Sequence, residues 1–593
     1  MSAIVISTFA DEHQHDPDQP QVDRKVEAEH VEQSSVTANQ DNLAYADEEE
    51  EPELHARTYL AIAALFVLNF VQVFALTGPP AILTYIGGDL DGSSIQNWVP
   101  NALSLVQAVG GPVISFASDT FQARKTLLIG TCTVSFIGAA IAPGSSNIYR
   151  VIVAQILIGF GFAAVPLAYA IPSEILPRRW RPIAQSLMNV AAAAGAITAP
   201  LVGGALSRSS AHNGWRNFYW VQMSLWGVTV IGVIIGYRPP KRHTKLDNLT
   251  LVQKLGRLDL PGMGLLTAGL TLLLTGLSLG GNPWAWSDVR VVSTLVVGIV
   301  TLVAFGIFEW KGTKTGILHH ELFASRTFPV CVSLIFVEGV LLFSIIIFYP
   351  ALTNALFETD PLLGGLRTIP FWVCAGGATV IYGLWSSKRR TIRSPLMTGF
   401  AIMTAGLIGL ATIQPDQSTR AIVFDGLAGL GFGSLLILIV AGVQLSTPHH
   451  LIATATAVVT SSRAIAASTF TAIYAAALTS RTAVKLPSYV ASAAQLGGLP
   501  PSSVEPFVEA LLNNDAATLF SIPGVTPAIV TSGVAALKQA LADSFRIVYI
   551  IAIPFGVVAI ILCWFLEDMS KAMTYRVDAP VEELHAKREQ GNA

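Results

Sequence analysis

The stretch Gly195-Ala196-Ile197-Thr198-Ala199-Pro200-Leu201-Val202-Gly203-Gly204 lies inside an apolar segment of residues 185–206. Glycine strips side chains from one face of a helix and lets a neighbouring helix approach closely. A proline inside a helix removes one backbone hydrogen bond and clashes with the carbonyl one turn earlier. The stretch therefore predicts a kinked, closely packed membrane helix, although glycine and proline are common in membrane helices generally.

The composition of the whole chain is that of a polytopic membrane protein. Of its 593 residues, 52% are hydrophobic and only 13% are charged, and the mean hydropathy is +0.56. Soluble domains carry roughly 25% charged residues. The net charge of −3 does not favour a nucleic-acid partner. The four cysteines lie in apolar runs without metal-ligand spacing, so no metal site is expected.

Apolar runs near the length of about 20 residues that crosses a bilayer recur along the chain. They cover residues 58–80, 97–118, 126–143, 150–172, 185–206, 217–237, 260–280, 289–308, 328–350, 363–385, 395–413, 420–445, 455–479 and 544–566. The predicted fold class is therefore all-α, with about 14 transmembrane helices.

Basic residues between the runs predict the orientation, because Lys and Arg collect on the cytoplasmic side. Every second connection holds a cluster of them. The clusters are Arg124 and Lys125; Arg178, Arg179 and Arg181; Arg238, Lys241, Arg242 and Lys245; Lys311 and Lys314; and Lys388, Arg389, Arg390 and Arg393. The alternation does not invert along the chain, which predicts an even number of spans with both termini in the cytoplasm.

Three segments lie outside the spans. Residues 1–57 are acidic and nearly free of large apolar side chains, so we expect a disordered cytoplasmic tail. Residues 481–543 are rich in Ala, Pro, Ser and Gly and are expected to form an extracellular loop with short helices. Residues 567–593 form the predicted second cytoplasmic tail.

An internal repeat divides the chain into two halves. Residues 157–164, Leu-Ile-Gly-Phe-Gly-Phe-Ala-Ala, match residues 427–434, Leu-Ala-Gly-Leu-Gly-Phe-Gly-Ser, and each copy lies in the middle of a span. Two parallel-related halves with a substrate site between them are the plan of the major facilitator fold. The predicted units are a six-helix bundle at 58–237, a second at 328–566, and between them, at 238–327, a cytoplasmic loop, two linker helices and an inner loop.

The opening stretch is similar to the antiporter motif Gly-x-x-x-Gly-Pro-x-x-Gly-Gly in the fourteen-span, proton-coupled branch of the major facilitator superfamily. The matching positions are Gly195, Pro200, Gly203 and Gly204, and Ala199 replaces the second glycine. In that family the motif is associated with export, so the resemblance implies a carrier that moves its substrate outward.

A loop motif and a helix motif agree with this resemblance. Residues 118–125 resemble the motif Asp-Arg-x-Gly-Arg-Arg/Lys, which implies that Asp119, Arg124 and Lys125 help to hold the inward gate shut. The fourth-helix motif Arg-x-x-x-Gly-x-Gly has Gln155 in place of its arginine. A neutral amide lacks the charge with which arginine tunes a neighbouring carboxylate.

Further matches narrow the branch to the fungal trichothecene efflux pump family and its siderophore-iron transporter relatives. They are Trp215–Tyr219, Asp259–Gly262, where Asp259 is expected to cap a helix, and Gly280–Ser287. The resemblance implies proton-coupled efflux of a hydrophobic, trichothecene-like secondary metabolite, by a monomer without a cofactor, in the plasma membrane or alternatively the vacuolar membrane.

Two other functions remain open at this stage. The long outer segment suits a proton-coupled importer of ferric siderophores as well as an exporter. A transporter-like sensor that binds a ligand without moving it is the other alternative, because Gln155 and the eroded Asp119 loop depart from the coupling motifs. No Gly-x-x-x-x-Gly-Lys-Ser/Thr motif appears, so neither an ATP-driven pump nor an enzyme is expected.

Three charged residues inside the runs are candidates for proton coupling. Glu338 lies well inside its span, where an ionised carboxylate costs about 2.5 to 3.5 kcal/mol and burial favours the neutral form. The alternative is a boundary glutamate that snorkels to the headgroups. Asp425 is also interpretable as an acid stabilised by a helix N-terminus, and Arg463 as the structural partner of a carboxylate or a side chain that reaches the inner interface.

Embedded amide side chains are candidates for the lining of a substrate cavity. They are Asn69, Gln72, Asn101, Gln107, Gln155, Gln222 and Gln444. Helix–helix hydrogen bonds explain each of them as well as substrate contact does. A cavity of amides and aromatic rings, with Trp220 and Trp226 nearby, suits a polycyclic oxygenated ligand of low charge.

Overall fold

The computed structural model describes residues 45, 47–93, 95–210, 212–239, 258–281, 284–313, 316–358, 360–512 and 516–586. Apart from three isolated β-bridges, the regular structure in these residues is helical. Most of the predicted acidic tail and the basic residues at 240–257 lie outside them. The α-helices are α2 (Ala56–Ala81), α3 (Leu83–Asp89), α4 (Trp98–Phe121), α5 (Arg124–Ile141), α6 (Ile148–Ala163), α7 (Val165–Ile175), α8 (Arg181–Ser209), α9 (Gly214–Gly236), α11 (Leu260–Leu279), α12 (Val289–Ile307), α13 (Thr327–Ile346), α14 (Phe348–Leu356), α15 (Pro361–Leu366), α16 (Ile369–Arg389), α17 (Arg393–Leu410), α18 (Ser418–Ser446), α19 (Ile452–Leu496), α20 (Pro501–Leu512), α21 (Ala516–Ser521) and α22 (Pro527–Cys563).

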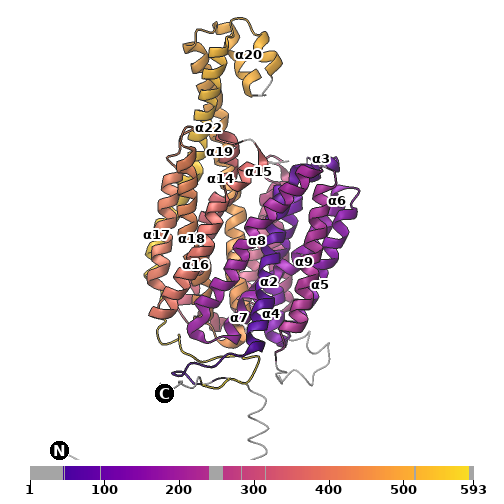
Figure 1. The fold of residues 1–593 in the computed structure, drawn as a ribbon, viewed down its shortest axis with the longest axis vertical. Coiled ribbons are helices and arrows are strands. Elements are labelled where there is room, and N and C mark those ends of the chain that lie inside the picture. The colour runs from indigo at the N-terminus through magenta and orange to yellow at the C-terminus, as the bar shows by residue number, and fades with distance from the viewer. Residues whose placement is uncertain are drawn as a thin grey trace, which may run out of the picture.

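The long helices run side by side in one upright bundle (Figure 1). Within the described residues, 13 helices are long and apolar enough to cross a membrane. α17 is a further helix of 18 residues with a polar start, and it packs against α18 and α22 in the bundle. Together these helices coincide with the runs that the sequence predicts, and the all-α fold class is confirmed.

Two hydrophobic cores divide the bundle. One is built mainly from α2–α9, which we call the N-half, and contains Leu65 and Trp215 at its centre. The other is built from α13–α22, which we call the C-half, and contains Phe400 and Phe432. Each core buries mainly the apolar faces of helices from its own half, and a few C-half residues such as Val440 and Ala453 pack into the N-half core.

The glycine repeat occupies corresponding positions in the two halves. A Cβ atom on Gly161 of α6 would lie 2.3 Å from Oγ of Ser135 on α5. A Cβ atom on Gly431 of α18 would lie 2.3 Å from the backbone nitrogen of Met403 on α17. The second glycine of each copy thus allows close contact with the third spanning helix of its half. The repeat in the sequence therefore corresponds to a repeat in the packing.

The hairpin of α11 and α12 covers the seam between the halves. Leu266 and Leu270 of α11 belong to a small cluster that includes Phe116 of α4, and Ile465 of α19 packs against the same cluster. Oδ1 of Asp259 accepts a hydrogen bond of 3.0 Å from the backbone N–H of Gly262, which caps α11 as the sequence predicts.

The segment at 481–543 differs from the expected loop. α19 continues to Leu496 and α22 begins at Pro527, so both helices extend beyond the bundle, with α20 at the tip (Figure 1). Alanine-rich sequence favours helix without needing lipid. The extensions also share a small core with α20 that buries Val490, Phe507 and Ile529. Hydropathy finds the part of a helix that crosses the membrane and misses a polar continuation of it.

Both described ends of the chain meet at one end of the bundle. Tyr45 forms an isolated antiparallel bridge with Val577. The side chains of Arg124, Arg178 and Arg181 lie at the same end, which we call the basic end. Because both described ends of the chain lie on one side of the bundle, the chain must cross the bundle an even number of times. The 13 candidate membrane helices and α17 together satisfy this requirement.

Candidate functional site

A buried ion pair lies in the C-half. Nε of Arg463 on α19 lies 2.7 Å from Oε2 of Glu338 on α13. The Glu338 side chain is fully buried, whereas that of Arg463 is 19% exposed. Glu338 therefore does not snorkel to the headgroups, and Arg463 has the carboxylate partner that one interpretation of the sequence gives it. The structure brings these two candidates together.

The neighbourhood of the pair explains its position. Gly339 follows Glu338, and a Cβ atom on it would lie 3.0 Å from the carbonyl oxygen of Arg463, so α13 and α19 touch here. Tyr169 on α7 of the N-half interacts electrostatically with both members of the pair. Oε1 of Glu338 and Nη2 of Arg463 are buried without a hydrogen-bond partner among the described residues. The pair thus keeps spare hydrogen-bonding capacity and lies within electrostatic reach of the other half.

Asp425 lies in a different environment. It is fully buried on α18, and neither carboxylate oxygen has a hydrogen-bond partner within the described part of the chain. α18 begins at Ser418, two turns earlier, and the effect of a helix dipole falls off within the first turn. The dipole of α18 itself therefore contributes little at Asp425, whereas the backbone of Phe371, in the first turn of α16, interacts with the carboxylate. Tyr349 and Tyr549 interact electrostatically with Asp425.

Asp119 links the two halves at the basic end. Its Oδ2 accepts hydrogen bonds from the backbone N–H of Thr454, at 2.7 Å, and from the Thr454 hydroxyl, at 2.8 Å. Its Oδ1 lies 3.0 Å from Nη2 of Arg124. Asp119 lies in the last turn of α4 in the N-half and Thr454 in the first turn of α19 in the C-half, so these bonds hold the halves together.

Arg124 joins Asp119 to a second acid. Its Nη2 lies 2.5 Å from Oε1 of Glu174 on α7, and both side chains are almost fully buried. Nδ1 of His449, in the C-half, lies 3.6 Å from the same Glu174 oxygen. Lys125 lies apart from this cluster, because its Nζ donates to the carbonyl of Ile234 on α9. Of the two basic residues that the loop motif predicts for the gate, only Arg124 joins this cluster.

Gln444 belongs to this gate and not to a cavity lining. Its Oε1 accepts hydrogen bonds from Oγ of Ser173, at 2.6 Å, and from Nε2 of Gln185, at 3.1 Å. Its Nε2 donates to the carbonyl of Tyr169 at 3.2 Å. All three partners lie in the N-half, so a single buried amide from α18 connects α7 and α8 to the C-half.

Two of the other amides connect helices within the N-half. Gln72 donates to the carbonyl of Gly161, and Gln155 donates to the hydroxyl of Tyr219, at 2.9 and 2.8 Å. For both, helix–helix bonding accounts for the side chain. Asn69 donates to the carbonyl of Leu65 one turn earlier in its own helix.

The remaining aromatic and amide candidates have varied surroundings. Asn101 and Gln107 are half-buried on α4, and Gln222 is fully buried on α9. Trp226 is fully buried, whereas Trp220 is 49% exposed. Of the two tryptophans, Trp226 therefore belongs to the packed interior of the N-half.

The antiporter-motif stretch packs α8 tightly against its neighbours. A Cβ atom on Gly195 would lie 2.5 Å from the carbonyl oxygen of Phe70 on α2, and one on Gly203 would lie 2.8 Å from Cγ2 of Ile82. Gly204 faces the C-half, where a Cβ atom would make an ordinary contact of 3.7 Å with Leu362. α8 continues without interruption through Pro200.

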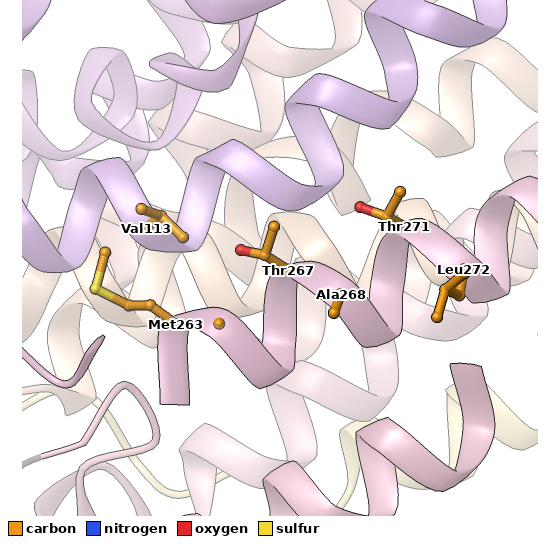
Figure 2. A pocket seen from close by; sticks show the side chains of 7 residues that line it. Val113, Met263, Thr267, Ala268, Thr271 and Leu272 are labelled. Atoms are coloured by element: carbon orange, nitrogen blue, oxygen red, sulfur yellow. The ribbon is translucent and has the colours of Figure 1, made fainter. Parts of the chain in front are cut away.

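A groove of about 620 Å³ lies between α4 and α11. Figure 2 shows Met263, Thr267 and Thr271 of α11 and Val113 of α4 along it. The groove is apolar and open, and none of the predicted site residues lines it. Among the described residues no group of three or more His, Cys, Asp or Glu side chains is placed to hold a metal ion.

Sequence reasoning missed several residues of the basic end, including Glu174, Thr454 and Asp578. Asp578 lies on the C-terminal tail and contacts Arg178 and Arg181. A weak signal for one of them was present, because Glu174 is an acid that lies two residues beyond the apolar run at 150–172. The acid on the tail has no local signal, since only the fold brings it to the arginines.

The geometry is that of two halves closed against one another at one end, and comparisons with known proteins show the family to which such a chain belongs. The family model for the fungal trichothecene efflux pump (TRI12) matches residues 26–590. The chain belongs to this family. It is therefore an efflux pump of the major facilitator type.

Relatives within this group include the MFS-type efflux pump LUC4 of a Fusarium species, which is 24% identical over 91% of this chain and 94% of its own length. The trichothecene efflux pump TRI12 of Fusarium sporotrichioides is 25% identical over 87% of each chain. Among solved structures, the proton:xylose symporter XylE has a TM-score of 0.52 at 12% identity, covering 87% of this chain and 99% of its own. That likeness concerns the fold alone.

Proposed function

We propose that this family member exports a hydrophobic, trichothecene-like secondary metabolite in exchange for protons, as a monomer. The family match supports export of this class of compound. The observation that supports proton coupling is the fully buried Glu338, whose one ion-pair partner among the described residues is Arg463. An embedded carboxylate with a single cationic partner can change its proton occupancy as that partner moves.

The pair suggests how the two ligands exclude one another. While Glu338 is ionised, Arg463 stabilises it through the 2.7 Å contact. A proton on Glu338 removes that attraction and frees Arg463. Rocking of the halves about a midplane site then carries the bound proton to the cytoplasm. The return movement carries the substrate outward. Asp425, buried without a cation within bonding distance among the described residues, is the second acid proposed for proton binding.

The orientation follows from charge. We place the basic end in the cytoplasm, because arginines and lysines collect on the cytoplasmic side of membrane proteins. With Asp119, Gln444 and Thr454 closing that end, the conformation is closed to the cytoplasm. We assign the protein to the plasma membrane, with the vacuolar membrane as the alternative site.

No contact in the described residues favours siderophore import. That alternative rested mainly on the segment at 481–543, which is largely helical, and the family match supports export. We therefore do not carry a second function forward.

Transport in inside-out vesicles tests the proposal. We expect a proton gradient, acidic inside, to drive accumulation of a labelled trichothecene, and an uncoupler to abolish it. Glu338→Gln keeps the size of the side chain and is expected to lose gradient-driven accumulation at wild-type expression. Equal accumulation in vesicles from the empty host would refute export of this compound class.

A further inference from the structure

The C-terminal tail lies against both halves of the transporter. Its first part contributes Leu566, Met569 and Met573 to the core of the C-half. Its second part contributes Val581 to the core of the N-half. These side chains are nearly fully buried. The tail is therefore attached by apolar burial to two units that move relative to one another during transport.

An acid on the tail binds the arginines of the basic end. The two oxygens of Asp578 lie 2.7 Å from Nη2 of Arg178 and 2.6 Å from Nη2 of Arg181. Nε of Arg576 lies 3.5 Å from the same carboxylate. The Asp578 side chain is only 3% exposed. Paired hydrogen bonds between buried charges are the strong ones, so this contact is a substantial part of the docking of the tail.

Arg181 connects the tail to the gate. Its Nη1 donates to the carbonyl of Gln444, and its Nε donates to the carbonyl of Ser173 at 3.0 Å. Gln444 and Ser173 are the residues that bridge the halves. One arginine therefore contacts the tail, the N-half and the C-half together.

Backbone hydrogen bonds extend the docking. The N–H groups of Arg178 and Arg179 donate to the carbonyls of Arg576 and Thr574, at 3.0 and 2.8 Å. The N–H of Ala579 donates to the carbonyl of Glu174 at 2.9 Å. The tail thus pairs with the connection between α7 and α8 on both sides of Asp578.

Little chain separates the two attachments. Met573 lies in the C-half core, and Val577, only four residues later, directly precedes Asp578, whose carboxylate contacts Arg178 and Arg181 of the N-half. Four residues span at most about 14 Å when fully extended. When the halves separate at the basic end, the tail has little slack and must leave one of its attachments.

We propose that residues 566–586 form a strap that holds the basic end closed, and that Asp578 is a gate residue supplied by this strap. Opening of the basic end releases Asp578 from Arg178 and Arg181, and closing restores the contact. The inference rests on the proposed alternating opening of the basic end, but it concerns the gate and not the identity of the substrate.

The strap does not act as a pH sensor near neutrality. Burial raises the pKa of Asp578, but the hydrogen bonds from Arg178 and the charge of Arg181 lower it, so the net pKa lies below the ordinary value. The charge of His449 lowers the pKa of Asp578 further. Asp578 therefore stays ionised until the pH falls below the usual aspartate range.

Accessibility labelling tests the strap. Ala453, a C-half residue fully buried against the N-half core, is replaced by cysteine as a reporter. A membrane-impermeant maleimide is applied to the basic end in inside-out vesicles, and labelling of the parent chain without the reporter is subtracted. This readout needs no substrate, so failure of the strap is distinguishable from failure of the proposed export.

In the Asp578→Asn protein the Ala453→Cys reporter is expected to be labelled about tenfold faster. Loss of one charge-assisted hydrogen bond changes the population of the open state by about this factor. Arg178→Gln, at a partly exposed position, is expected to act in the same direction. The matched control is Asp568→Asn, because Asp568 is exposed and, among the described residues, accepts hydrogen bonds only from Ser570 within the tail.

Unchanged labelling in a folded, monodisperse Asp578→Asn protein overturns the strap. An equal rise in Asp568→Asn also overturns it, because the effect would then belong to any loss of charge on the tail. If Asp578→Asn fails to fold, the Arg178→Gln result decides in the same way.

Discussion

The contact between Asp119 and Thr454 predicts a measurable coupling across the gate. Asp119 accepts two hydrogen bonds from Thr454, at 2.7 and 2.8 Å, and Thr454→Val removes the hydroxyl bond only. Hydrogen bonds to charged groups contribute about 1.5 to 3 kcal/mol. Asp119→Ala removes both and also leaves Arg124 with Glu174 as its one remaining acid partner among the described ion pairs.

A double-mutant cycle isolates the shared bond. Gate opening is measured as maleimide labelling of a Val440→Cys reporter, because Val440 of α18 is buried in the N-half core. We expect Thr454→Val to open the gate about 10- to 150-fold more often, which corresponds to about 1.5 to 3 kcal/mol, and Asp119→Ala to open it more than that. The effects of the two substitutions combined should fall short of additivity by about the same 1.5 to 3 kcal/mol. Additive effects would refute the conclusion that the carboxylate and the hydroxyl act on one another in the closed state.

Other predictions follow from close packing and surface charge. Gly195→Ala puts a Cβ atom 2.5 Å from a backbone oxygen, so we expect the protein to lose about 1 to 3 kcal/mol of stability and to have a lower Tm in detergent. Gly204→Ala puts a Cβ atom 3.7 Å from Leu362 and should leave the Tm unchanged. Equal shifts of Tm in the two variants would contradict the packing argument. Gly203→Leu should abolish transport while the protein still folds, and unchanged transport would reduce the motif to ordinary packing. Burial raises the pKa of Asp89, but hydrogen bonds from His212, Trp215 and Arg216 lower it below the ordinary value. The ionised carboxylate therefore stabilises the folded protein above about pH 4, and this stabilisation is lost as the pH falls through the lowered pKa. Asp89→Asn should therefore lower Tm at pH 7, with the difference shrinking in acid; a difference that grows in acid would contradict this sign.

The membrane part of the fold is readable from the sequence because each span must be apolar over about 20 residues. The predicted run at 97–118 and α4 (Trp98–Phe121) differ by a few residues only. The extensions of α19 and α22 were not predicted, since they are stabilised by alanine-rich helix and by a separate core that includes Phe507. Hydropathy carries no information on either.

The site is predictable only in part. Glu338 and Arg463 stand out because charges inside apolar runs are costly, but nothing in the sequence pairs residues 125 positions apart. Gln444 was expected in a cavity and lies in the gate, because an embedded amide signals a buried polar contact without identifying its partner. Asp578 follows the last span in an ordinary polar tail, and its role depends on contacts about 400 residues away in sequence.

The central claim is that the buried pair couples export to proton movement. In proteoliposomes that enclose a pH-sensitive dye, addition of a trichothecene should drive protons across the membrane in the opposite direction to the substrate. Glu338→Gln should abolish this proton movement while substrate binding persists, and Asp425→Asn, measured in parallel, shows whether the second acid contributes. Proton movement at the wild-type rate in folded Glu338→Gln protein would contradict the account.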